Sequence, residues 1–235
     1  MAGGAFLNTT YELVKSAKYF IQGHTEDFGK IFELSLNDMY FQIHFIVCDD
    51  EQTIKMLEKY FVYVKQNAFL LDTPEEFASW LNENVTQFTA DWLEENRRDM
   101  LFADKAGAYE VQSGADAYLP GNEIDDLEYI CTLENYICNL PEIHRQTALA
   151  FYYDDLPMEK LEELLHMDAI RIKKRIEYIE KTLNQQMKQY CKERGYSMPK
   201  VDSQKILRAL SELAKLYRYP DAMGLWQQIN SRTIR

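Results

Sequence analysis

Four cationic side chains lie within five consecutive residues of the second half of the chain: Arg171, Lys173, Lys174 and Arg175. Guanidinium and ammonium groups bind phosphate oxygens, and Arg also binds the edges of bases through its planar fork. On a helix, Arg171, Lys174 and Arg175 would share one face with Tyr178. The residue types and their spacing therefore suit a helix that binds nucleic acid.

The isoleucines of the same stretch favour that helix and place it in a core. They lie at helical spacing with a leucine and predict one apolar stripe: Ile172, Ile176, Ile179 and Leu183. The preceding segment, PMEKLEELLHM, predicts a short helix separated by a tight turn. A short helix, a turn and a longer basic helix together make the helix-turn-helix layout, whose second helix enters the major groove of DNA.

A plainer interpretation of the basic cluster stays open beside this one. Runs of charge on a helix are commonly solvated faces. Here the cations would pair with Glu177 and Glu180 on the same helix, or with the acidic first half of the chain. Spacing alone does not separate the two interpretations.

Charge is distributed unevenly along the 235 residues, whose formal net charge is -12. Residues 1–126 carry -14, residues 127–199 carry -2 and residues 200–235 carry +4. An acidic first half gives no long-range attraction to a phosphate backbone, so any contact with nucleic acid must come from local clusters.

Apolar spacings of three and four, with few Gly and Pro, predict an all-α protein. The expected helices are 9–21, 26–47, 50–68, 74–99, 124–138, 142–153, 157–165, 168–193, 202–218 and 221–230. Three of the nine glycines lie in 104–122, which predicts a flexible linker. We therefore expect two helical domains joined by this linker, followed by a C-terminal helical extension. Their expected bounds are 1–103, 104–123 for the linker, 124–195 for the helix-turn-helix domain, and 196–235.

Other kinds of site find little support in the sequence. No phosphate-binding glycine loop, nucleophile elbow or zinc pattern occurs, so the sequence predicts no enzyme and no cofactor. His44 and Cys48 are four residues apart, but without a second pair nearby a buried helix face is favoured over a metal site. Four scattered cysteines, no signal peptide and no long apolar run predict a cytoplasmic protein with reduced thiols and no membrane segment.

Residues 140–183 resemble region four of small bacterial sigma factors, the extracytoplasmic-function type of the sigma-70 family. The matching residues are Leu140, Pro141, Arg145, Ile172, Lys173, Arg175 and Leu183. In that family, the helix that contains the last four positions recognises the upstream, minus-thirty-five promoter element. The resemblance therefore implies that Arg171, Lys173, Lys174, Arg175 and Tyr178 bind promoter DNA.

Residues 28–99 resemble region two of the same family, in the expected order and at the expected distance. Asp50 begins the segment that matches the polymerase-binding helix, and Phe61 matches its Phe. The resemblance implies a polymerase-binding surface of Asp50, Lys55, Glu58, Lys59 and Val62. Phe77, Trp80 and Leu81 match the Phe-x-x-Trp-Leu signature of the promoter-melting segment, whose candidates here are Gln87, Asp91, Trp92, Arg97 and Arg98.

Several positions depart from the family pattern and indicate a diverged member. Thr53-Ile54-Lys55 replaces Ala-Glu-Asp, and Glu94 stands where a basic residue is expected. In region four, Glu162 replaces a small residue, His166 replaces the usual turn Gly, and Arg171 replaces the Thr that opens the recognition helix.

The resemblance implies a transcription initiation factor that binds core RNA polymerase and recognises double-stranded promoter DNA, with an anti-sigma or other regulatory protein as a further possible partner. The acidic region two motivates an alternative, a sigma-like regulator that binds polymerase or another protein without melting DNA. An unrelated helical adaptor remains if the resemblance is accidental.

The C-terminal extension, 200–235, lies outside the resemblance. Its stripe comprises Ile206, Leu207, Leu210, Leu213, Leu216 and Tyr217. An extra packing helix is the favoured interpretation, over recruitment of a partner helix.

Overall fold

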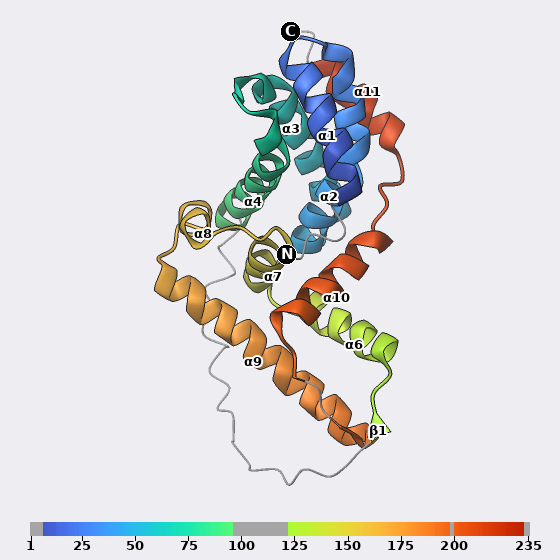
Figure 1. Ribbon diagram of the computed structural model, residues 1–235, viewed down its shortest axis with the longest axis vertical. Helices are drawn as coiled ribbons and strands as arrows, with labels where there is room; N and C mark the ends of the chain where they lie inside the picture. Colours follow the sequence, from blue (N-terminus) through green and yellow to red (C-terminus); the bar gives the residue numbers. More distant parts are fainter. Residues whose placement is uncertain (1–6, 96–121, 198–199, 233–235) are drawn as a thin grey trace. The chain divides into compact units, whose positions relative to one another are not determined.

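The computed structural model describes residues 7–95, 122–197 and 200–232, and it is all-α as predicted (Figure 1). The chain divides into two compact units. The first comprises residues 1–89 together with 211–235, and the second comprises residues 90–210. The boundaries cross two helices, α4 and α10, and the C-terminal extension contributes to both units.

Helices make up almost all of the described regular structure. The first unit is built from α1 (Leu7–Ile21), η1 (Thr25–Asp27), α2 (Phe28–Val47), α3 (Asp50–Asn67), η2 (Ala68–Leu70), η3 (Pro74–Glu76), most of α4 (Phe77–Glu95), and α11 (Ala222–Arg232). The second is built from β1 (Asn122–Glu123), α6 (Asp126–Cys138), α7 (Glu142–Ala148), η5 (Leu149–Tyr153), α8 (Met158–Leu164), α9 (Ala169–Arg194), β2 (Tyr196–Ser197) and the first half of α10 (Ser203–Leu216).

Helix α2 is the centre of the first unit. Its buried aromatic residues pack with those of neighbouring helices, and the core includes Phe28, Phe41, Tyr60, Phe61 and Phe77. The Tyr60 hydroxyl donates to the Leu81 carbonyl at 3.0 Å, so its polar end is satisfied inside the core. Phe61 is fully buried, which gives the Phe of the polymerase-binding motif a packing role.

Helix α11 completes this unit by covering apolar side chains of α2. The Trp226 ring lies 5.8 Å from that of Phe28 and 5.2 Å from that of Phe32, measured between centroids. Leu225 and Ile229 are buried beside it. Burying an aliphatic side chain of this size contributes about 1.5–3 kcal/mol, and an aromatic pair adds about 0.5–1.5 kcal/mol. Helix α11 is therefore held by several such contributions.

The second unit packs α6, α7 and α8 against α9, and the start of α10 contacts α6. Arg145 is buried and donates through Nη1 to the carbonyls of Leu140, at 2.8 Å, and Cys138, at 3.2 Å. These acceptors lie at the end of α6 and in the following turn, so Arg145 fixes the connection from α6 to α7. The Arg that matches the family motif therefore has a structural role here.

Two further contacts attach α10 to the second unit. Arg208 pairs with Asp126 through two hydrogen bonds of 2.9 and 2.6 Å, and the Asn184 side chain binds the backbone of Val201. Ile206, Leu210 and Leu213 of the predicted stripe are buried, whereas Leu207 is half-buried and Leu216 is 72% exposed, so the stripe packs only in part.

The predicted helices agree with the described ones to within a few residues, and two features of backbone were missed. Residues 149–153 form a π turn at the end of α7, and β1 pairs with β2 as a two-residue parallel ladder. The predicted linker, 104–123, lies outside the described residues except for its last two, which form β1. No described helix combines the length and apolar character needed to cross a membrane.

Candidate nucleic-acid and protein interfaces

The N-terminus of α9 is capped by the carboxylate of Asp168, the residue just before the helix. Asp168 precedes the helix with an extended backbone, and its Oδ1 accepts from the Arg171 backbone N–H at 2.9 Å. Its Oδ2 lies 3.3 Å from Arg171 Nε. Asp168 thus caps the helix and holds the Arg171 guanidinium near the first turn.

A second carboxylate crosses the turn from α8. Glu162 Oε1 accepts from the Ala169 backbone N–H at 2.6 Å, satisfying another donor of the first turn of α9. The carboxylate that replaces the family's small residue thus connects the two helices. Sequence reasoning missed this function, although an acidic side chain shortly before a helix start was a usable signal.

The turn itself contains a strained residue. His166 has φ 50°, in the left-handed region that favours Gly, just after α8 ends. Beneath the turn, α8 and α9 share a core cluster with the preceding π turn and loop. Its buried members are Ala150, Leu156, Leu161, Leu164, Leu165 and Ile172. Packing thus fixes α8, the turn and the start of α9 against each other.

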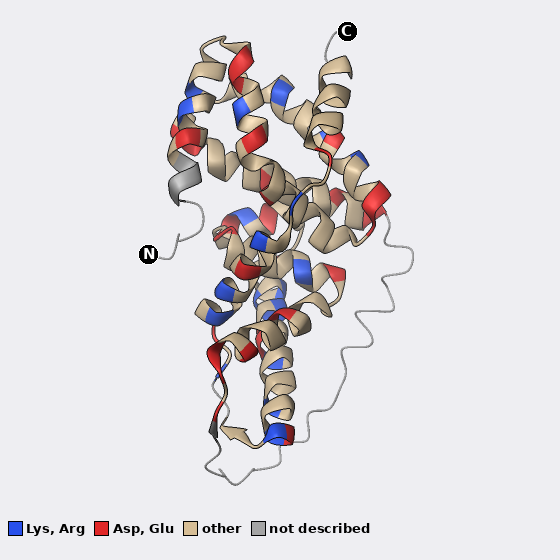
Figure 2. Ribbon diagram, turned by 90° about the vertical axis from the view of Figure 1, so that its right-hand side faces the viewer, with Lys and Arg blue, Asp and Glu red and all other residues tan. Residues whose placement is uncertain are grey.

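The apolar stripe predicted for α9 is confirmed. Ile172, Ile179 and Leu183 are fully buried, Ile176 is half-buried, and the stripe continues through Met187 and Cys191. The basic residues lie on the remaining surface, and Figure 2 shows the cations in blue. Arg171, Lys173 and Lys174 are exposed.

The remaining two DNA-binding candidates are partly enclosed. Arg175 and Tyr178 are half-buried, and the Tyr178 ring stacks on His144 with 4.6 Å between centroids. One face of Tyr178 is therefore occupied by protein.

The alternative pairing of the cations with Glu177 and Glu180 is not seen for Lys173 and Lys174, which make no ion pair among the described residues. Glu180 instead accepts from the Tyr152 hydroxyl at 3.1 Å. Burial, together with the nearby carboxylate, raises the pKa of Tyr152. Lys173 and Lys174 are thus exposed ammonium groups in the N-terminal half of α9.

Helix α3 contains the candidate polymerase-binding residues. Asp49 caps it by accepting from the Gln52 backbone N–H at 2.7 Å, so Asp50 is its first residue, as predicted. Asp50, Lys55 and Lys59 are exposed. In contrast, Val62 is half-buried, and Glu58 is only 7% exposed. Lys55 pairs with Glu51 one turn earlier along the surface.

Helix α11 lies beside this surface of α3. A groove between them is lined by Glu51, Ile54, Lys55 and Glu58 of α3 and by Gln228 and Ser231 of α11. Lys65 of α3 donates to Asn230 at 2.8 Å, and burial lowers the pKa of Lys65. Two candidate polymerase-binding residues, Lys55 and Glu58, therefore line a groove shared with the C-terminal helix.

Of the promoter-melting candidates, Gln87, Asp91 and Trp92 lie in the second half of α4. Asp91 is exposed, Gln87 and Trp92 are half-buried, and Arg97 and Arg98 lie outside the described residues. Glu94 and Glu95 are exposed in the last turn.

The aromatic residues of the α4 motif mainly serve packing. Phe77 is fully buried, and Trp80 is half-buried and stacked on Tyr63 with 6.0 Å between centroids.

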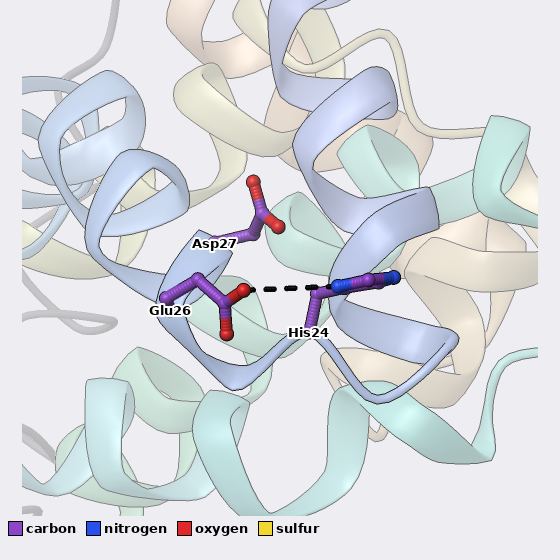
Figure 3. A group of neighbouring side chains, drawn as sticks. All are labelled: His24, Glu26 and Asp27. Atoms are coloured by element: carbon purple, nitrogen blue, oxygen red, sulfur yellow. Dashed lines mark ion pairs between the residues drawn. The ribbon is translucent and has the colours of Figure 1, made fainter.

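One group of metal-binding residue types occurs among the described residues, at the turn between α1 and α2. Figure 3 shows His24, Glu26 and Asp27, with His24 Nδ1 3.7 Å from a Glu26 oxygen. His24 and Glu26 are exposed, and all three residues are close in sequence. This is an ordinary surface ion pair with an acidic neighbour.

His44 contacts α3, and Cys48 ends α2. His44 Nδ1 lies 3.3 Å from the Thr53 hydroxyl, whereas Cys48 ends α2 with a left-handed backbone, and its thiol donates to the Phe45 carbonyl at 3.7 Å. Among the described residues, neither side chain belongs to a group of three or more residues that could hold a metal ion.

Comparison with known proteins supports the resemblance stated for the sequence. No protein-family model matches the chain. The chain is similar to the ECF RNA polymerase sigma factor SigW of Bacillus subtilis (strain 168), with 24% identity over 179 residues. The match covers 74% of this chain and 96% of the relative. This weak similarity, spread over nearly the whole relative, supports the resemblance to the extracytoplasmic-function type of the sigma-70 family.

Proposed function

We propose that the chain is a sigma-like transcription initiation factor that binds core RNA polymerase and recognises promoter DNA through α8 and α9. The observation that carries the proposal is the similarity to a sigma factor over 96% of that protein's length. It is supported by an all-α fold in which α3 begins at Asp50 and α9 spans the segment that resembles the recognition helix.

The proposed DNA-binding surface is the N-terminal half of α9. Lys173 and Lys174 are exposed there, without ion pairs among the described residues, and supply phosphate contacts. Arg171 is exposed, and its Nε lies 3.3 Å from Asp168 Oδ2, so its terminal amino groups are not taken by this ion pair. Such a guanidinium suits the acceptor pair of a guanine edge in the major groove.

The proposed polymerase-binding surface is the exposed face of α3. Asp50, Lys55 and Lys59 offer charges of both signs on a helix fixed by its buried opposite face. A protein partner is favoured over DNA here because residues 1–126 carry -14.

A second function is favoured by the end of α4. Glu94 and Glu95 are exposed at the end of α4. The family pattern has a basic residue at position 94. Carboxylates there would repel the phosphates of a DNA strand. A regulator that binds polymerase without opening DNA would follow from this feature.

The deciding experiment reconstitutes the full chain with core polymerase and maps transcription start sites across genomic DNA. Specific start sites support the initiation factor. Polymerase binding without initiation identifies the regulator, and absence of polymerase binding overturns both.

A matched pair of charge reversals tests the DNA-binding surface within the same assay. Lys174→Glu should reduce promoter binding by roughly tenfold or more, because one phosphate contact becomes a repulsion. Lys192→Glu lies 18 residues further along α9, about 27 Å at 1.5 Å per residue, and should leave promoter binding within about twofold. Equal effects of the two variants would place the DNA elsewhere.

A further inference from the structure

Helix α11 supplies one side of the groove that contains candidate polymerase-binding residues. Lys55 and Glu58 of α3 face the groove from one side, and Gln228 and Ser231 of α11 face it from the other. Ile54 also lines the groove and is 39% exposed. The groove thus combines charged groups, hydrogen-bonding groups and one exposed apolar side chain.

Helix α11 is anchored by contacts that do not depend on the groove. Leu225 and Ile229 are buried, and Trp226 packs on the rings of Phe28 and Phe32. Releasing α11 would return all of this apolar surface to water. The helix is therefore a fixed part of the surface that an approaching protein meets, rather than a cover that opens.

We propose that α11 forms one wall of the polymerase-docking surface, so that core RNA polymerase contacts Gln228 and Ser231 together with the exposed face of α3. This inference rests on the proposed function and adds a segment, the C-terminal extension, that lies outside the sigma resemblance. Continuity carries it: Lys55 and Glu58, assigned to the polymerase surface from the sequence, line the same groove as the two α11 residues.

The chemistry of the groove defines what part of the polymerase it fits. Glu51 and Lys55 pair with each other along α3, while the Gln228 amide both donates and accepts hydrogen bonds. A polar helix with one apolar side chain directed at Ile54 would match this lining.

Two neighbouring glutamines on α11 provide a matched test. Gln227 and Gln228 are both exposed, but only Gln228 lines the groove. Each is replaced by Arg in the full chain, and the affinity for purified core polymerase is measured by biolayer interferometry. We expect Gln228→Arg to weaken binding about tenfold, since a bulky cation fills the groove, and Gln227→Arg to stay within about twofold.

Further measurements keep the outcomes distinct. Ser231→Arg fills the same groove from the next turn and should weaken binding similarly, which covers the case in which Gln228→Arg fails to fold. If the wild type binds polymerase tightly and neither groove variant changes that affinity, the inference is overturned and the proposed function stands. A wild type that does not bind polymerase overturns both. Sedimentation that shows a dimer lost only in the groove variants, with unchanged polymerase binding, would assign the groove to a second copy of the chain and overturn the inference.

Discussion

Among single side chains, His166 makes the most direct stability prediction. Its φ of 50° is uncommon for a residue with a Cβ, and the left-handed conformation costs about 1–2 kcal/mol. His166→Gly removes that cost but adds flexibility to the unfolded chain, worth about 0.5–1 kcal/mol. We expect a net gain of about 0.5–1 kcal/mol in the free energy of unfolding, measured by urea denaturation.

His166→Ala is the control for this change, because Ala also carries a Cβ and should gain nothing. A loss of stability in the Gly variant would show that the His166 side chain stabilises the turn by more than its backbone strain costs.

Some of these residue-level features could be predicted from the sequence, and others could not. The motif comparison singled out His166 and Glu162 as departures, but it could not assign the αL backbone or the bond to Ala169, since both depend on how α8 meets α9. Burial of Phe77, Ile172 and Ile179 was predictable because each follows the helical repeat. The low exposure of Glu58 was not predictable, because a charged residue is expected on the solvent side of a helix.

The junction between α8 and α9 allows a test at the level of secondary-structure elements. Glu162 bonds the Ala169 backbone N–H at the start of α9, and no other described acceptor is seen for that N–H. Glu162→Ala should lower the free energy of unfolding by about 1 kcal/mol, in the range of helix-cap substitutions, and should weaken promoter binding by loosening α9. Thermal denaturation and fluorescence anisotropy measure the two effects.

The adjacent Glu163 is the control for Glu162. It is exposed and pairs with Lys160 at 3.6 Å on the surface, so Glu163→Ala should change stability by less than about 0.5 kcal/mol. Because both substitutions remove one negative charge, improved DNA binding in both would show that charge outweighs the cap.

Elements were predicted more reliably than their connections. Apolar periodicity and the Pro and Asp signals located the helices, including α11, to within a few residues. The pairing of β1 with β2 and the contact of Trp226 with Phe28 join residues far apart in sequence, and no local pattern encodes such contacts. The groove beside α3 was for this reason not foreseeable from the sequence.

For the whole molecule, the uneven charge determines how DNA affinity should respond to salt. Each phosphate neutralised contributes about -0.9 to the slope of log affinity against log salt concentration. Four cations lie at 171–175, of which Arg171 is paired with Asp168 and Arg175 is half-buried. Two to four contacts predict a slope of about -2 to -4, or a loss of roughly 10- to 150-fold in affinity between 50 and 200 mM salt.

Anisotropy of a labelled promoter duplex, titrated with the full chain at several salt concentrations, measures this slope. Replacing Lys173 and Lys174 together by Gln should reduce its magnitude by about 1.8, because two ion-releasing contacts disappear. A much steeper wild-type slope would require contacts from cations outside α9. A slope near zero would mean that the -14 charge of residues 1–126 cancels the attraction and that the isolated chain does not hold DNA without polymerase.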